Sequence, residues 1–392
     1  MIGVRGGARK GWQEGDVIIA PDKFKGSLTA PQVAAHLAAG LRRARPELPV
    51  LTVPVADGGD GTVDALVASG YSRLQTTVTG PVGNPVVASY AVRDETAVVE
   101  LAEASGLRRL PGGPTPASAL AASSVGTGEL IRTAVQGGAR RILLGLGGSA
   151  CTDGGAGLLT AFGARLLDAD GQPLPPGGAA LARLETIDLS ELIRVPVTIA
   201  SDVDNPLLGP NGAAYTYGAQ KGAGPDELAE LERGLTRFAE VARRDLGVDL
   251  AERPGAGAAG GVGFGAMAFL GATMRPGVEI ILEHVDFDAL LSGARLVITG
   301  EGSLDEQTLH GKAPIGVARA AARAEVPVLA VSGRLQVARS MLRRFGFEDA
   351  FALTDIESDP EVCMAEAGRL LEELALRIAE TGAIEPLTRN AL

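Results

Sequence analysis

Residues 142–157, with the sequence ILLGLGGSACTDGGAG, constrain the fold more than any other part of the chain. An apolar run ends in glycines, and Ser149, Thr152 and Asp153 follow where a second glycine-rich turn begins. The apolar run predicts a buried strand. Small residues beyond its end let the backbone approach a ligand, and their N–H groups can face an anion. Because residues 145–150 also match the loose G-x-G-x-x-A dinucleotide pattern, phosphate transfer and hydride transfer are both open here.

Strand and helix patterns alternate at both ends of the chain, which is typical of a parallel sheet with crossover helices. The first helix is expected to begin at a capping box formed by Thr29 and Gln32. Its apolar side chains recur at a spacing of four, which predicts one buried face. The expected strands are residues 16–20, 49–55, 295–299 and 326–332, and the expected helices run to residue 44, to residue 68, and over 314–324 and 361–379.

The middle of the chain has a different pattern. Short apolar runs at 75–79, 86–92 and 96–101 are separated by turn signals such as GPVGNP, which predicts antiparallel or mixed pairing. We expect a loop over 111–118 and a hairpin over 165–174. A chain of 392 residues exceeds the ~250–300 at which one core stops growing, so two domains are expected.

The predicted fold class is therefore α/β with two domains. One is a Rossmann/flavodoxin-like parallel-sheet domain built from residues 15–78 and 283–385. The other is an inserted mixed α/β domain of residues 79–282, and residues 1–14 are expected to form a disordered tail.

Charge and cysteine content exclude several kinds of partner. The net charge of −11 argues against nucleic acid or an anionic membrane as the main partner, because both require a basic face. No secretory signal or transmembrane stretch is expected. The two cysteines form no CxxC pair and no disulfide framework, which favours a reducing cytoplasm. The assembly state is left open, with a homodimer as one candidate.

Acidic, lysine-bearing and glycine-rich loops follow the expected strands, where ligands bind in open α/β sheets. Lys23 and Lys25 precede a helix and suit a phosphate or a carboxylate, although a solvated loop would look the same. Asp57 and Asp60 flank two glycines, and Asp60 or Thr62 could instead cap the next helix.

Two further loops carry carboxylates. Asp202, Asp204 and Asn205 follow a strand in a tight turn that suits Mg²⁺, or an Asx turn before a proline. Glu301 and Asp305, in a loop that also carries Lys312, could hold metal or accept a proton. Residues 255–265 (GAGAAGGVGFG) require close backbone approach, to a ligand or to another segment, or form a hinge.

Phosphoryl transfer explains these loops better than hydride transfer. A dinucleotide fold needs a crossover helix after the glycines, and only residues 156–163 are available for one. Phosphoryl transfer needs metal, cationic or backbone donors and a group that orients the hydroxyl, all of which the loops offer. The alternatives are a dehydrogenase of a small hydroxy acid that uses NAD, and a solute-binding protein.

Six blocks, in order, closely resemble those of the glycerate kinase family that phosphorylates the 2-hydroxyl. They are IAPDKFKGSLTA, VADGGDGT, GLGGSACTDGGAG, SDVDNPLLGPNGAAYTYGAQKGA, GAGAAGGVGFG and TGEGSLDEQTLHGKAPIGVA. The resemblance spans residues 16 to about 380 and departs from many relatives at Cys151-Thr152. It implies an ATP- and Mg²⁺-dependent kinase that converts D-glycerate to 2-phosphoglycerate, with two α/β domains and an active site in the cleft between them.

With this resemblance, the candidate site residues receive provisional roles. The catalytic candidates are Lys25, Asp202 and Asp305, and the metal candidates are Asp202, Asp204 and Glu301. The substrate-binding candidates are Lys23, Ser27, Asp57, Asp60, Asn205 and Lys312. The nucleotide-binding candidates are Gly147, Gly148, Ser149, Asp153, Gly260, Gly261 and Gly263.

Overall fold

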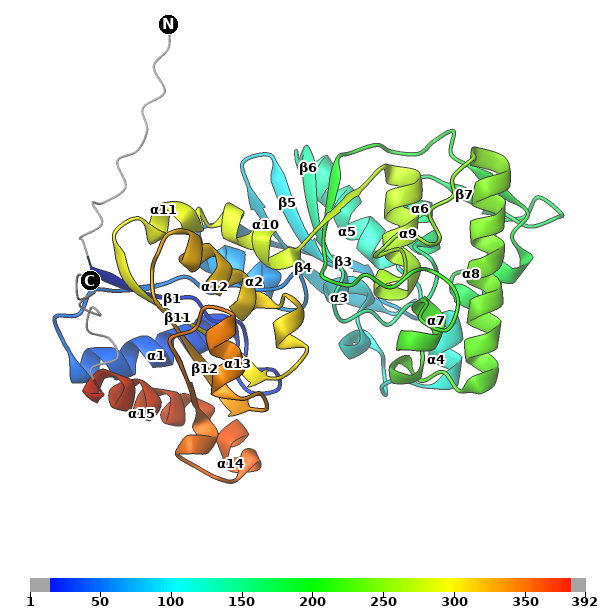
Figure 1. The fold of residues 1–392 in the computed structure, drawn as a ribbon. Helices are drawn as coiled ribbons and strands as arrows, with labels where there is room; N and C mark the ends of the chain where they lie inside the picture. Colours follow the sequence, from blue (N-terminus) through cyan, green and yellow to red (C-terminus); the bar gives the residue numbers. More distant parts are fainter. Residues whose placement is uncertain (1–14, 382–392) are drawn as a thin grey trace, which may run out of the picture. The chain divides into compact units, whose positions relative to one another are not determined.

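A computed structural model describes residues 15–381, which divide into two compact units (Figure 1). The first unit comprises residues 15–55 and 282–381, and the second comprises residues 56–281. The expected α/β fold, with one parallel sheet and one mixed sheet, is confirmed. The tail expected over residues 1–14 and the domain end at 382–385 lie outside the described residues.

The first unit is built on a five-stranded parallel sheet in the order β13-β12-β11-β1-β2. Counted along the chain, this is the flavodoxin-like order 2-1-3-4-5, whose switch point lies between β1 and β11. The strands are β1 (Asp16–Ile19), β2 (Val50–Thr52), β11 (Ala294–Leu304), β12 (Val328–Leu335) and β13 (Asp349–Ala352). The helices are α1 (Ala30–Ala44), α11 (Phe287–Leu291), α12 (Ala313–Arg323), α13 (Arg339–Arg344), α14 (Pro360–Ala365) and α15 (Ala367–Glu380), with short turns η4 (Thr308–His310) and η5 (Leu353–Asp355).

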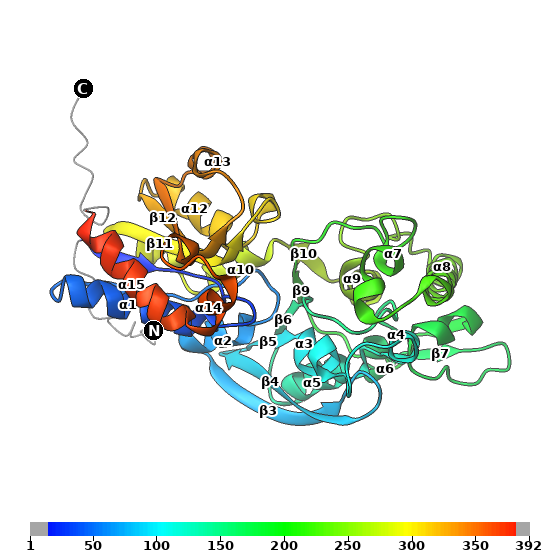
Figure 2. The same cartoon turned by 90° about the horizontal axis from the view of Figure 1, so that it is seen from below.

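Helices α1 and α15 lie side by side on one face of this sheet, and α12 lies on the other (Figure 2). The predicted capping box of Thr29 and Gln32 is present, and the apolar stripe of α1 is fully buried. A Cβ at Gly40 would lie 2.3 Å from the Glu372 carbonyl oxygen, so only glycine lets the two helices approach this closely.

The second unit contains a six-stranded sheet in the order β10-β9-β6-β5-β4-β3, parallel from β10 to β5 and antiparallel from β5 to β3. Its strands are β3 (Ser72–Thr79), β4 (Pro85–Arg93), β5 (Thr96–Glu100), β6 (Arg141–Gly145), β9 (Val197–Ala200) and β10 (Thr273–Arg275), and a separate pair is β7 (Arg165–Leu167) and β8 (Thr186–Asp188). Its helices are α2 (Thr62–Ala68), α3 (Leu101–Ser105), α4 (Pro116–Ala121), α5 (Val125–Gln136), α6 (Ala156–Ala161), α7 (Ala213–Tyr217), α8 (Pro225–Leu246) and α9 (Ala258–Leu270). The turns η1 (Leu107–Arg109), η2 (Gly178–Arg183) and η3 (Ala219–Lys221) complete it, and α10 (Gly277–His284) spans the limit between the units.

Four local features differ from the sequence-based expectation. Residues 56–78, expected in the first domain, belong to the second unit, because β3 pairs with β4 along its whole length. The loop expected over 111–118 ends at Thr115, which caps α4 in a capping box with Ser118. The hairpin over 165–174 is reduced to one bridge, since β7 pairs with β8. The last helix is broken at Glu366 into α14 and α15.

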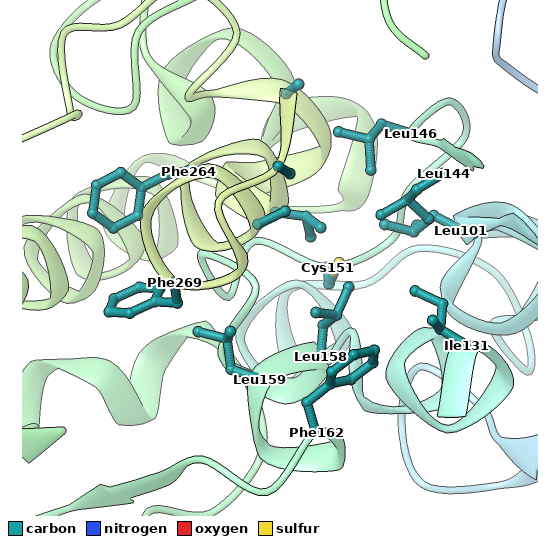
Figure 3. Close-up of a cluster of buried hydrophobic side chains, with 14 of the residues drawn as sticks. Leu101, Ile131, Leu144, Leu146, Cys151, Leu158, Leu159, Phe162, Phe264 and Phe269 are labelled. Carbon is teal, nitrogen blue, oxygen red and sulfur yellow. The ribbon is translucent and has the colours of Figure 1, made fainter. Parts of the chain in front are cut away.

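The core of the second unit surrounds the segment that follows β6. Cys151 is fully buried and lies among leucines and phenylalanines of β6, α6 and α9 (Figure 3). Burial raises the pKa of its thiol far above the usual range. Cys151 therefore acts as a small apolar core residue.

Candidate functional site

In the first unit, the loop that follows β1 touches the last part of β11 at the switch point of the sheet. The strand expected to end at residue 299 continues to Leu304, so Glu301 lies within β11 and pairs with β12. The Asp22 N–H donates to the Gly300 carbonyl at 2.8 Å. A Cβ at Gly302 would lie 3.2 Å from the Lys25 nitrogen. Because glycine allows this approach, the Lys23–Ser27 segment lies against the last residues of β11. The structure thus brings two of the predicted loops together, at the position where this sheet order binds ligands.

The side chains of the β1 loop have mixed surroundings. Lys23 is half-buried and lies 3.6 Å from the buried carboxylate of Asp22, which sequence analysis did not single out. Lys25 is exposed. The Ser27 hydroxyl is buried without a hydrogen-bond partner in the part of the chain that the structure describes. An exposed cation beside an unused hydroxyl suits an anionic group of a substrate.

The end of β11 and the segment that follows it hold a lysine between two carboxylates. The Lys312 ammonium nitrogen lies 3.8 Å from Glu301 Oε2 and 3.8 Å from Asp305 Oδ1. Thr308 joins the same cluster, since its hydroxyl donates to Glu301 Oε1 at 2.7 Å and its N–H to Asp305 Oδ1 at 3.1 Å. The charge of Lys312 is thus already balanced, and the cluster retains a net negative charge. Thr308 carried no signal in the sequence, because threonine is common in any loop.

Ser332, on the neighbouring strand β12, is a second residue that sequence analysis missed. It lies opposite Glu301 in the parallel register. Its side chain is fully buried, and the hydroxyl has no hydrogen-bond partner within residues 15–381. A buried unpaired hydroxyl is uncommon and costs stability, so Ser332 becomes a further candidate site residue beside Glu301.

In the second unit, the acidic loop Asp57–Gly61 crosses the carboxyl ends of β6 and β9. A Cβ at Gly58 would lie 2.5 Å from the Ala200 carbonyl oxygen, and one at Gly145 would lie 2.4 Å from the Gly58 carbonyl oxygen. Gly58 also has a φ of +87°. Any side chain at these positions would push the loop away from the strands. The glycines therefore serve to hold Asp57 and Asp60 over the strand ends.

Asp202 lies beside this loop, directly after β9. Its Oδ1 accepts a hydrogen bond of 3.3 Å from the Gly277 N–H. The residue is exposed, yet desolvation of the carboxyl group, and then the carboxylates of Asp57 and Glu279, raise its pKa to about 7. A carboxylate with a pKa near neutrality is suited to take up a proton in general base catalysis.

Only one carboxylate oxygen of Asp60 has a polar partner among the described residues. Its Oδ2 lies 3.3 Å from the Arg108 guanidinium, whereas its buried Oδ1 has no hydrogen-bond partner among the described residues. A Cβ at Gly148 would lie 2.7 Å from that Oδ1, so Gly148 is packed against Asp60. The structure thus places one predicted nucleotide-binding residue beside a predicted substrate-binding residue.

Asp204 and Asn205 differ from Asp202. Asp204 is exposed. The Asn205 amide donates to the Asn211 carbonyl at 2.8 Å and accepts from the Tyr217 hydroxyl at 2.6 Å. Its polar atoms therefore bind the following loop, and its predicted contact with substrate stays a prediction.

Residues 150–157 form their hydrogen bonds within the second unit. Asp153 is fully buried. Its Oδ2 accepts from the Ser124 N–H at 2.8 Å and from Gly157 N–H at 3.2 Å, and its Oδ1 accepts from Gly155 N–H at 3.1 Å. The Ala150 N–H, next to Ser149, donates to the Ser105 carbonyl. These groups hold the turn, and no donor among them faces an open site.

The glycines of α9 approach this same turn. A Cβ at Gly260 would lie 2.1 Å from the Cys151 carbonyl oxygen, and one at Gly261 would lie 2.9 Å from the Gly154 Cα. A Cβ at Gly263 would lie 2.2 Å from the Gly255 carbonyl oxygen. The run therefore permits close approach to another segment, which was one of the expected alternatives. Nucleotide binding by Gly147, Ser149, Gly260, Gly261 and Gly263 stays a prediction.

Two buried charged residues of the second unit escaped the sequence analysis. Glu100 ends β5 and is 4% exposed, and Lys221 is 1% exposed with its ammonium group donating to the Cys151 carbonyl at 2.5 Å. Desolvation lowers the pKa of Lys221 and raises the pKa of Glu100 to about 8. A carboxylate at the end of an apolar strand, before a helix, was the only signal for Glu100.

Metal binding can be judged from the carboxylates present. Within residues 15–381, no group of three or more histidine, cysteine, aspartate or glutamate side chains is arranged to hold a metal ion. Mg²⁺ commonly takes only one or two carboxylates and completes its shell with water and phosphate oxygens. The carboxylates of Asp57 and Asp202 repel each other when both are charged. A cation bound to them would relieve this repulsion, so the pair suits Mg²⁺. Also within these residues, no helix is long and apolar enough to cross a membrane.

Comparison with known proteins identifies the family. The model of the glycerate kinase family matches residues 17–383. This chain belongs to the glycerate kinase family. It is 42% identical to a glycerate kinase of Bacillus subtilis over 93% of this chain and 96% of that protein. It is 43% identical to the glycerate 2-kinase of Escherichia coli over 86% of this chain and 90% of that protein.

A solved structure agrees with this assignment. The crystal structure of a protein proposed to be glycerate kinase 2, from Salmonella typhimurium LT2, matches with a TM-score of 0.81 and 40% identity. The match covers 94% of this chain and 98% of that chain. The resemblance to this family is therefore confirmed, and the dehydrogenase alternative finds no support. A kinase family implies ATP as a substrate.

Proposed function

We propose that this member of the glycerate kinase family transfers the γ-phosphoryl group of ATP to the 2-hydroxyl of D-glycerate. The observation that carries the proposal is the match along nearly the whole chain to relatives named for this reaction, including a glycerate 2-kinase. The acidic loop and Asp202 support it, because they place a carboxylate whose pKa is raised to about 7 at the carboxyl ends of two strands.

Asp202 is the proposed general base. The 2-hydroxyl oxygen forms a bond to the γ-phosphorus while the bond from that phosphorus to the β,γ-bridging oxygen breaks. The hydroxyl proton passes to Asp202, and ADP leaves with the electron pair of the broken bond. Most of the catalysis of such a transfer comes from positioning and charge stabilisation, so a base that orients the hydroxyl is sufficient.

Lys23, Lys25 and Ser27 are proposed to bind the carboxylate of glycerate or a phosphate group. The exposed ammonium of Lys25 and the unpartnered hydroxyl of Ser27 support this role. Asp57, Asp60 and Asn205 are proposed to contact substrate hydroxyls. In the first unit, Lys312 is proposed to stabilise phosphate charge, with Asp305 and Glu301 holding it in place.

Mg²⁺ is proposed as the cofactor. Its candidate ligands are Asp204 and Asp57 in the second unit, with Asp202 as the alternative to its role as general base, and Glu301 in the first unit. When bound, the ion would offset the negative charge of the phosphate oxygens. The raised pKa of Asp202 supports this, since a cation there would relieve repulsion from Asp57. Nucleotide is proposed to bind along Gly147, Gly148 and Ser149.

A coupled assay tests the proposal. ADP formation is measured with purified protein, ATP and Mg²⁺ over glycerate, hydroxypyruvate and lactate, with NADH in place of ATP as the control. Glycerate should be the preferred acceptor, and ³¹P NMR of the product should show 2-phosphoglycerate. Oxidation of NADH without consumption of ATP would refute the proposal.

The cellular setting and assembly are proposals of the same kind. A cytoplasmic location agrees with two buried free cysteines and with small phosphorylated metabolites as reactants. A homodimer is the proposed assembly. Sedimentation of the purified protein at several concentrations decides between monomer and dimer.

A further inference from the structure

Glu100 is a buried carboxylate that the proposed mechanism does not use. It ends β5, in the middle of the sheet of the second unit, and lies opposite Gly145 of β6 in the register. Its Oε1 accepts from the Val63 N–H at 2.5 Å, and its Oε2 accepts from the Gly61 N–H at 3.2 Å. One oxygen therefore binds the last residue of the acidic loop, and the other binds the first turn of α2.

These two hydrogen bonds replace a cap that the local sequence does not supply. Gly61 is the N-cap of α2, has a φ of +93° and makes no side-chain hydrogen bond to the helix. The Thr62 hydroxyl donates to the Gly59 carbonyl at 2.8 Å instead of capping. Asp60, the other expected cap, pairs with Arg108. A carboxylate at a helix N-terminus satisfies free N–H groups and interacts favourably with the helix dipole.

The surroundings of Glu100 are otherwise unfavourable for a charge. Desolvation, and then the nearby carboxylates of Glu103 and Asp60, raise the pKa of Glu100, while the Val63 and Gly61 N–H groups lower it. Arg109 and Arg108 are paired with Glu103 and Asp60 rather than with Glu100. A hydrophobic residue would fill this site without that cost. The charged carboxylate instead holds the acidic loop in place through its hydrogen bonds to Gly61 and Val63.

We propose that Glu100 is a positioning residue for phosphoryl transfer, which holds Asp57 and Asp60 in place by binding Gly61 and Val63. The proposal rests on the proposed function for the role of the acidic loop. It assigns Glu100 no contact with substrate. The loop has glycines at three of its five positions, and its own side chains contribute the hydrogen bond from the Gly59 N–H to Asp57 Oδ1 at 3.0 Å. The glycines leave its far end dependent on the two hydrogen bonds to Glu100.

Glu129 provides a matched control in the same unit. Its Oε2 accepts from the Thr79 N–H at 2.7 Å and its Oε1 accepts from the Thr79 hydroxyl at 3.0 Å. It therefore joins a helix to a strand by two hydrogen bonds, as Glu100 does. However, β3 is the edge strand, two strands beyond β5, and carries no candidate site residue.

The experiment compares Glu100→Gln with Glu129→Gln by steady-state kinetics and by hydrogen exchange of peptides covering residues 57–63. The measurements are made at pH 9, above the raised pKa of about 8, where Glu100 is charged and both of its oxygens accept. Glutamine keeps the shape of Glu100 but turns an NH₂ group toward one of the two N–H donors. We expect Glu100→Gln to lower kcat about 10–100-fold, since small displacements of reacting groups have effects of this size. KM for ATP should change little, and exchange should accelerate in residues 57–63 alone. Glu129→Gln should keep kcat within about twofold.

Other outcomes overturn the proposal. A folded Glu100→Gln protein with the kinetics of Glu129→Gln would show that the two hydrogen bonds serve stability only. Should Glu100→Gln fail to fold, Glu100→Asp, which keeps the charge but is one methylene shorter, must show the same loss of kcat. If neither variant folds, Glu100 is required for folding and the positioning role is rejected. Absence of glycerate phosphorylation in the unaltered protein would instead refute the proposed function, and hydrogen exchange would still report on the loop.

Discussion

Two glycine-rich segments of the second unit have similar sequences but different surroundings. The Asp57–Gly61 loop has half-buried carboxylates, one of which has a buried oxygen without a partner. The turn that contains Asp153 is fully buried, and its carboxylate accepts hydrogen bonds on both oxygens. In both segments glycine allows the backbone to approach a neighbour. Only in the first does the approach leave acidic groups available for a ligand.

This comparison separates two roles of glycine beside an acid. In the acidic loop, glycines place Asp57 and Asp60 over strand ends. In the turn and in α9, glycines from two segments pack directly against each other and form the interior of the unit. Spacing and composition do not distinguish these cases. The hydrogen-bond partners of the carboxylate do, because a fully satisfied buried carboxylate has no capacity left for a substrate.

The largest effect is expected for Asp153→Asn. An asparagine there turns NH₂ protons toward N–H and O–H donors that now have no acceptor. We expect the free energy of unfolding to fall by about 3–5 kcal/mol, as for the loss of one member of a buried charged network. Urea denaturation measures it. Asp168→Asn, in the exposed turn after β7, is the control and should cost at most about 1 kcal/mol. If Asp153→Asn is stable but inactive, the distinction between the segments is wrong.

Asp202→Asn should have the next largest effect, on catalysis instead of stability. Removal of the general base is expected to lower kcat at least about 100-fold, equivalent to about 2.7 kcal/mol, while the protein stays folded. Stopped-flow and steady-state assays measure kcat, and circular dichroism checks the fold. Asp226→Asn, on the first turn of α8, is the matched control and should leave kcat unchanged. Near-normal turnover of Asp202→Asn would remove Asp202 from the mechanism.

A smaller effect is expected for Gly263→Ala. The new Cβ would lie 2.2 Å from the Gly255 carbonyl oxygen, so the α9 turn must shift. Overpacking of this kind typically costs about 1–3 kcal/mol, measured by thermal or urea unfolding. An unchanged KM for ATP would show that this run serves packing alone. Gly137→Ala, whose Cβ would be 3.4 Å from its nearest neighbours, is the control. A raised KM for ATP with unchanged stability would favour the nucleotide role predicted for this run.

The smallest expected effect is a pH dependence of stability. The pKa of Asp202 is raised to about 7, so its protonated form is favoured in the folded state. Its contribution to stability is present below the unfolded pKa and is lost as pH rises through about 7. The unaltered protein should therefore lose stability relative to Asp202→Asn between about pH 4 and pH 7. Parallel urea titrations would show this, and a difference that does not vary with pH would contradict the raised pKa.

Part of the site could be predicted from sequence because its signals are local. Loops after apolar strands carry acids, lysines and glycines, and the order of a parallel sheet brings such loops to one edge. These signals were sufficient to propose Lys25, Asp57 and Asp202 as site residues, and their roles stay predictions. Asp153 had the same local signal as Asp57, and only its neighbours distinguish it. Glu100 had one weak local signal, its place between an apolar strand and a helix, and its partners are distant in sequence. Thr308 and Ser332 had none, because threonine and serine are too common to be informative.

The sequence by itself determined the α/β class, the capped first helix and the family, because periodicity, caps and long motif blocks are properties of neighbouring residues. The tertiary structure decided where residues 56–78 pack, which carboxylates are satisfied, and which residue caps α2. The physical reason is the range of the interactions. Burial and desolvation depend on residues 37 to 145 positions away, as between Glu100 and Val63 or between Asp202 and Asp57.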